Sequence, residues 1–158
     1  QESDPVRCGY DALREGGAAA IWVHHFAEIV LRARPVWLPK DIQTPKEIYE
    51  WLSAFCTYLR TERPANDVRL LWNVADALKH AVLTRTPPEH LHISRNEAVL
   101  VLSNVYGSGN FGEGKYGGVL EVTILTNDGR RALSGVLQNV IDAWRIAARL
   151  PMPPINMP

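Results

Sequence analysis

The chain has 158 residues, which is enough for one domain with a substantial buried core. Lys and Arg total 17 and Asp and Glu total 17, so the net charge is zero, which argues against a large, sequence-independent footprint on nucleic acid. A local basic patch remains a candidate at the arginines in positions 130, 131, 145 and 149. No apolar run reaches the roughly 18 residues of a membrane span, and two cysteines without a CxxC motif lead us to expect a cytoplasmic, disulfide-free protein with no membrane partner.

The first predicted helix runs from about Tyr10 to Arg34. Apolar residues recur along it at helical spacing and predict an inward face: Trp22, Val23, Phe26, Ile29, Val30 and Ala33. A proline-bounded loop follows. Its Trp37 lies outside any helical pattern, which makes it a candidate contact surface.

Two more helices are predicted before position 90. In Thr44-Pro45-Lys46-Glu47, Thr is an N-cap, Pro fits the first helical position and Glu completes a capping box. We expect this helix to reach about Arg60. The next helix is predicted from about Asp67 to Arg85, and Pro87-Pro88 ends it.

The pattern changes in the second half of the chain. Residues 98–102 and 119–125 predict two strands, and Asn127-Asp128-Gly129 is a hairpin turn signal before a short returning strand, Arg131-Ala132-Leu133. Ser134 is a candidate N-cap for a last helix that reaches about Leu150. The inward positions expected on this helix are Val136, Leu137, Val140, Ile141 and Trp144.

These elements predict an α+β fold with about four helices and a small three-stranded antiparallel sheet before the last helix. The sheet contains a hairpin with a long glycine-rich loop. We expect a single domain over residues 1–158. It divides into a helical part over about 10–86, a β-hairpin part over about 97–133, a C-terminal helix over about 135–150 and a proline-rich tail over 151–158.

The helix predicted at 67–85 carries a line of polar residues in an otherwise apolar sequence. Arg69, Asn73, Asp76 and His80 fall on a stripe roughly 60° wide. A helix that is apolar nearly all round is usually buried, and buried polar groups need partners. The stripe therefore predicts either a structural network or a site, in which Asp76 orients the imidazole of His80 as an acid–base pair.

The first helix offers a second polar face, with His24, His25, Glu28 and Arg32. If the two faces meet, His24 and Glu28 join Asp76 and His80 as two imidazoles and two carboxylates, a set that helical bundles use to hold metals. A divalent-metal hydrolase is therefore one alternative; without it we expect no cofactor. The other interpretation is a solvated face on the first helix.

The spacing Asn73-x2-Asp76-x2-Lys79-His80-x4-Arg85 resembles a helix signature of uncharacterised bacterial proteins. More loosely, residues 10–86 are similar to HEPN-like helical domains. Many members of that family are metal-independent RNases of toxin and phage-defence systems, in which an Arg and a His on one helix cut RNA at a dimer interface.

The resemblance implies a catalytic role for His80, with Asn73 and Asp76 as its partners, and a homodimer. Arg69 and Lys79 are candidate binding residues on the same helix. The chain departs from the family pattern, because Arg69 lies about 16 Å from His80 along the axis and His80 precedes Arg85 instead of following an Arg.

Residues 107–118, GSGNFGEGKYGG, form a glycine-rich loop between two predicted strands. One interpretation is a flexible hairpin tip in which the glycines supply positive φ. The other is a flap whose Phe111, Lys115 and Tyr116 contact a nucleic acid strand or a protein partner. The loop is longer than a tight hairpin requires, which favours the second interpretation.

Three function classes follow from these patterns. The first is a HEPN-like, nucleic-acid-related bacterial domain of a defence or mobile-element system, with RNA binding and His80 as acid or base. The alternatives are a non-enzymatic protein-interaction module and the metal-dependent hydrolase. The sequence leaves open whether the protein is an enzyme. The paired-helix site requires that the polar faces of the helices at 10–34 and 67–85 meet.

Overall fold

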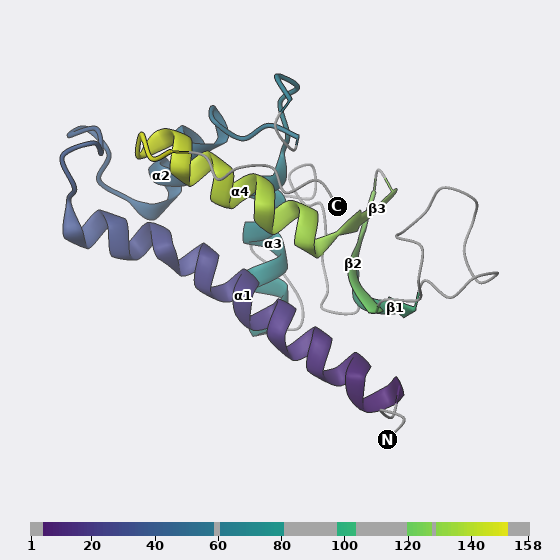
Figure 1. Cartoon of the computed structure of the whole chain (residues 1–158). Helices are drawn as coiled ribbons and strands as arrows, with labels where there is room; N and C mark the ends of the chain where they lie inside the picture. Colours follow the sequence, from purple (N-terminus) through teal and green to yellow (C-terminus); the bar gives the residue numbers. More distant parts are fainter. Residues whose placement is uncertain (1–4, 59–60, 81–97, 104–119, 128, 152–158) are drawn as a thin grey trace.

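The computed structural model describes residues 5–58, 61–80, 98–103, 120–127 and 129–151 (Figure 1). Within these ranges the elements are α1 (Pro5–Ala33), α2 (Pro45–Ser53), α3 (Asp67–His80), β1 (Val99–Ser103), β2 (Leu120–Thr126), β3 (Gly129–Ala132) and α4 (Leu133–Ala147). The sheet is antiparallel in the order β1-β2-β3. The predicted α+β fold, with the sheet before the last helix, is confirmed.

The long helix α1 contacts the other three helices and the sheet (Figure 1). Its C-terminal half lies beside α4, with α2 and α3 behind, and its N-terminal half approaches the sheet. Gly16 lies where α1 meets β2 and the start of α4, because a Cβ there would come within 3.2 Å of the side chains of Val122 and Leu133. The absence of a side chain at this position permits the close packing of helix on strand.

Several local predictions are confirmed. The capping box of α2 is present: the Thr44 side chain accepts a hydrogen bond from the backbone N–H of Glu47, whose carboxylate accepts one from the Thr44 backbone. Backbone N–H groups of Gln43 and Thr44 lower the pKa of Glu47. The β2–β3 hairpin is also present, and Gly129 has the positive φ, +123°, that favours glycine.

Two predicted boundaries are wrong. Helix α2 ends at Ser53 and not near Arg60, because the chain turns back and the backbone N–H of Tyr58 donates to the carbonyl of Arg63. Helix α4 begins at Leu133, directly after β3, so Ser134 is an exposed helical residue and not the N-cap. The N-cap is Ala132, which has no side-chain capping bond. Residues 81–85 of the predicted third helix lie outside the described residues.

The inward face predicted for α1 is largely wrong. Trp22, Phe26 and Ile29 are 70%, 41% and 49% exposed. The buried face carries Ala20, His24, Ala27 and Val30, of which Val30 was predicted to face inward. This helix is apolar on two sides, and its small-residue side is the one that lets neighbouring elements approach closely. On α4, Val136, Val140 and Trp144 are buried as predicted, whereas Ile141 is exposed.

Two further features concern the environment of the chain. Among the described residues, no helix combines the length and apolar character needed to cross a membrane. Cys8 and Cys56 are both free. Burial raises the pKa of the Cys56 thiol to about 11, so this thiol stays protonated at neutral pH.

Candidate functional site

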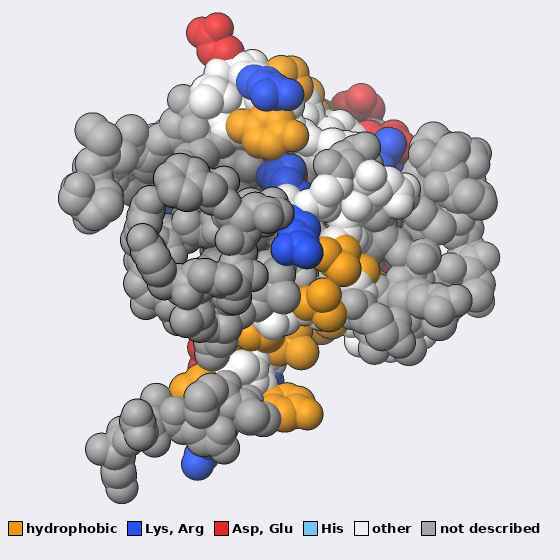
Figure 2. Space-filling model, turned by 90° about the vertical axis from the view of Figure 1, so that its right-hand side faces the viewer, with side chains coloured by type: hydrophobic (Ala, Val, Ile, Leu, Met, Phe, Trp, Pro, Cys, Tyr) orange, Lys and Arg blue, Asp and Glu red, His pale blue; other side chains and the backbone are white. Residues whose placement is uncertain are grey.

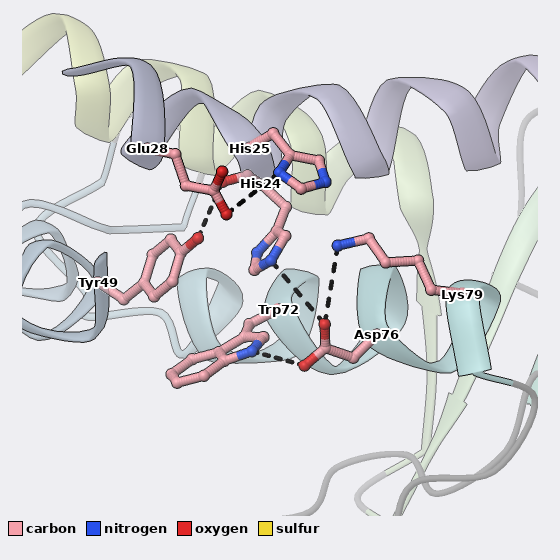
Figure 3. Close-up of polar contacts among 7 residues, drawn as sticks. All are labelled: His24, His25, Glu28, Tyr49, Trp72, Asp76 and Lys79. Atoms are coloured by element: carbon pink, nitrogen blue, oxygen red, sulfur yellow. Dashed lines mark hydrogen bonds and ion pairs between the residues drawn. The ribbon is translucent and has the colours of Figure 1, made fainter. Parts of the chain in front are cut away.

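The polar faces of α1 and α3 meet, as the paired-helix hypothesis requires (Figure 3). His24 Nε2 lies 3.9 Å from Asp76 Oδ1, and Lys79 Nζ lies 3.9 Å from the same oxygen. His25 Nδ1 lies 3.4 Å from Glu28 Oε1 beside them. We name this group the junction cluster; its members are His24, His25, Glu28, Tyr49, Trp72, Asp76 and Lys79.

His24 forms the floor of the junction cluster. Its ring stacks on Tyr49 with 5.2 Å between centroids and on Trp72 with 6.4 Å, and the Tyr49 hydroxyl donates to the His24 carbonyl over 2.9 Å. Burial is the main cause that lowers the pKa of His24 to about 4, and the positive charge of Lys79 adds to it. The imidazole is therefore neutral at pH 7.

Asp76 lies at the rim of the junction cluster, and its side chain is 30% exposed. Trp72 Nε1 donates to Asp76 Oδ2 over 2.7 Å, which fixes the carboxylate. The separation of 3.9 Å between His24 and Asp76 exceeds a hydrogen bond, and a neutral imidazole carries no charge to pair. Lys79 is therefore the cation that faces this carboxylate.

The polar stripe of α3 is mainly its solvent-exposed side and not a buried line. Arg69 and His80 are exposed and Asp76 is half-buried, whereas Asn73 is buried. Exposure explains why the stripe is polar in an otherwise apolar helix. Asp76 contacts Trp72, one turn before it, and no Asp76–His80 ion pair is found among the described residues.

The four predicted metal ligands do not converge. His24 approaches Asp76, while Glu28 pairs with His25. Among the described residues there is no group of three or more His, Cys, Asp or Glu side chains that could hold a metal ion. Arg32 is exposed on α1. The remaining candidates, Phe111, Lys115 and Tyr116 with Arg85, lie outside the described residues.

A second polar cluster, which the sequence patterns did not reveal, lies at the start of α3. Asp67 is fully buried, and its Oδ2 accepts hydrogen bonds from Arg131 Nη2 at 2.7 Å and Asn139 Nδ2 at 2.6 Å. The Arg131 guanidinium also lies 5.0 Å from the centre of the Tyr58 ring. The sequence signal for Asp67 was only that of an acidic residue in a first helical turn.

This cluster limits the predicted basic patch. Arg131 is held in an ion pair with Asp67, so its charge is largely compensated. On the sheet end of the molecule, the visible Lys and Arg side chains lie among hydrophobic and neutral ones and do not merge into one basic surface (Figure 2). Arg145 and Arg149 lie on and just after α4, away from β3.

An apolar groove of about 470 Å³ lies along the contact of α1 with α4. Its wall includes Trp22, Phe26, Ile29, Trp37, Trp144 and Leu150. Trp37 stacks on Trp51 and meets the edge of Trp144, with centroid distances of 6.3 and 6.4 Å. The exposed α1 side chains that were predicted to face the core therefore line this groove together with Trp37.

The rim of the junction cluster carries groups of both charges, because the carboxylates of Asp76 and Glu28 lie beside an ammonium group and an imidazole. Lys79 supplies an ammonium group at the rim, and His25 supplies an imidazole that is more than one-third exposed. Aromatic rings of Tyr49 and Trp72 lie beneath them. No family model, curated protein or solved structure matches the chain.

Proposed function

We propose that the chain is a HEPN-like, nucleic-acid-related domain that acts on RNA through the junction cluster and the adjacent end of α3. The contact of His24 with Asp76 carries this proposal, because it joins the polar faces of two helices that are distant in the sequence. Because both cysteines are free, we assign the activity to the reducing environment of the cytoplasm.

In this proposal the accessible groups contact RNA and the buried groups position them. Lys79 binds a backbone phosphate, because its ammonium group lies at the rim beside Asp76. His80 follows it on the exposed end of α3 and serves as acid or base. Trp72 holds Asp76 in place through its hydrogen bond, and the His24 ring lies beside that carboxylate.

The corresponding reaction is transesterification of the RNA backbone. A base takes the proton of the 2′-hydroxyl, the 2′-oxygen bonds to phosphorus, and the P–O5′ bond breaks. The leaving 5′-oxygen takes a proton from an acid, and the products are a 2′,3′-cyclic phosphate and a 5′-hydroxyl. Lys79 stabilises the charge that builds up on the phosphate oxygens.

An RNA cleavage assay in EDTA, with an end-labelled single-stranded RNA and the purified full chain, tests this function. We expect cyclic-phosphate products, and a rate that falls about 100-fold or more in His80→Ala and Lys79→Ala. Lys46→Ala is the matched control, because Lys46 is an exposed lysine on α2 away from the cluster. The proposal fails if the parent protein neither binds nor cleaves RNA, or if the His80 and Lys79 variants, shown to be folded by circular dichroism, keep the parent rate.

A further inference from the structure

We propose that the apolar groove between α1 and α4 binds an amphipathic helix of a partner protein, with apolar anchors along the groove and a carboxylate beside Arg145. This surface lies on the side of α1 opposite its buried face and is separate from the junction cluster. It therefore adds an interaction to the RNA-directed function and does not depend on that function.

Large apolar side chains are exposed along the groove to a degree that folding alone does not explain. Trp22 is 70% exposed, and Leu150 on the opposite wall is 56% exposed. Contiguous exposed apolar surface of this kind marks interaction sites in soluble proteins, and tryptophan is enriched among the residues that dominate binding energy.

The length of the groove fits two turns of a helix. Its lining residues extend over Trp22–Ile29 on α1 and from Ile141 on α4 to its C-cap, Ala148, which is about 10 Å along each axis. A helix that presents apolar residues at positions i, i+3 or i+4, and i+7 covers the same length. Pockets for small molecules enclose most of their ligand, whereas this groove is open to solvent along its length. An open groove suits a helix that lies across the protein surface.

The groove is built in advance of binding. Phe26 packs edge-on against Trp144 with 5.0 Å between ring centroids, and Trp37 joins Trp144 to Trp51. Rings held in this way lose little freedom when a partner arrives, which lowers the entropic cost of association.

The positive charge of Arg145 at the edge of the groove favours a partner with a carboxylate. Arg145 is the charged side chain among the described groove residues, and exposed Arg149 follows it at the end of α4. The Arg145 Nε and Nη2 groups donate to the carbonyl of Pro151, so three of its five N–H groups remain available. Asp142 lies three residues before Arg145 but is buried and accepts a bond from Gln138, and no ion pair between Asp142 and Arg145 is found among the described residues.

A carboxylate on the partner complements this rim. A second copy of the chain would bring the same arginines to the interface, and like charges oppose such pairing. The occupant that the groove fits is therefore an acidic amphipathic helix of another protein.

Selection of 12-residue peptides from a phage-displayed library on the full chain tests the proposal. We expect enriched peptides with apolar residues at i, i+3 or i+4 and i+7 and at least one Asp or Glu. For a synthetic, fluorescein-labelled selected peptide, Trp22→Ser and Ile29→Ser should each weaken binding about 10-fold or more, measured by fluorescence anisotropy. Val36→Ser is the matched control, because Val36 is exposed but does not line the groove, and binding should be unchanged.

A charge reversal tests the acidic requirement. Arg145→Glu should weaken the acidic peptide about 10-fold, and replacing the peptide carboxylate by Lys should restore binding to this variant. The proposal is overturned if the selected peptides lack acidic residues or bind Trp22→Ser as well as the parent. Two other occupants would also overturn the proposal if no peptide binds. One is an anionic phospholipid vesicle that binds the parent chain but not Trp22→Ser. The other is a second copy of the chain, shown by self-association in analytical ultracentrifugation that Trp22→Ser abolishes. RNA cleavage serves as the independent readout, because groove variants should leave it unchanged.

Discussion

Asp67 and Arg131 lie 64 positions apart in the sequence and form an ion pair in which Arg131 Nη2 donates to Asp67 Oδ2 over 2.7 Å. Asn139 donates to the same oxygen, so one buried carboxylate joins the start of α3 to β3 and to α4. A buried carboxylate requires such partners, because an unpaired charge in the interior is strongly unfavourable. The pair therefore fixes how the helical part meets the sheet.

Replacing Asp67 by Ala should lower the free energy of unfolding by about 2–4 kcal/mol, because Arg131 and Asn139 lose their shared acceptor. Urea denaturation followed by circular dichroism measures the change. Asp41→Ala is the control, since Asp41 is exposed, and it should stay within about 0.5 kcal/mol of the parent. Equal effects of the two substitutions would contradict the structural role of Asp67.

The pKa of His24 makes stability depend on pH. In the folded chain this pKa is about 4, below its ordinary value of 6.5, so the unfolded chain binds the proton more readily. The neutral His24 ring therefore contributes its full share to the free energy of unfolding above pH 6.5. About 2–3 kcal/mol of this free energy is lost as the pH falls from 6.5 to 4.

His24→Phe keeps an aromatic ring but cannot titrate, so its stability should vary less than that of the parent between pH 4.5 and 7. Urea unfolding at the two pH values gives the comparison, with His25→Phe as the control that keeps the parent dependence. An NMR titration that finds the His24 pKa near 6.5 would refute the prediction.

The thiol of Cys56 should be unreactive in the folded protein. Burial raises its pKa to about 11 and closes access, whereas Cys8 is partly exposed. With a thiol reagent at pH 8, we expect one fast equivalent in native protein and two in urea. In Cys8→Ser the fast equivalent should disappear; if it remains, Cys56 is accessible and its packing differs from that described.

The two helix starts provide a matched pair of substitutions. Thr44→Ala removes an observed capping bond and should cost about 1 kcal/mol of stability. Ser134→Ala should change stability by less than about 0.5 kcal/mol, because Ser134 is an exposed helical residue and α4 has no side-chain cap. Thermal unfolding of both variants measures the difference, and a larger loss in Ser134→Ala would show that it caps α4 after all.

The accuracy of the sequence-based predictions depended on the range of the interactions. The capping box at Thr44 and the turn before Gly129 involve residues within a few positions, so their patterns predicted them. The exposure of Trp22 depends on which side of α1 the other helices cover, and helical periodicity carries no such information.

The candidate site was predictable only in part. The polar stripe led to Asp76, and the first polar face led to His24, but their contact depends on the packing of separate helices. Lys79 was predicted only as a binding residue, and its approach to Asp76 was not foreseen. The partners of Asp76 also differ from the expected ones, because Trp72 donates to it from one turn before. Asp67 was missed as a buried acceptor, since its partners come from β3 and α4.

The strand β3 ends at Ala132 and α4 begins at Leu133, so no linker lies between them. A shift of one residue in the β2–β3 pairing would therefore turn the start of α4 by about 100°. Such a turn would carry Val136 out of the core and Ile141 and Trp144 away from the groove. The short hairpin at Gly129 thus determines which side chains of α4 face the core and which line the groove.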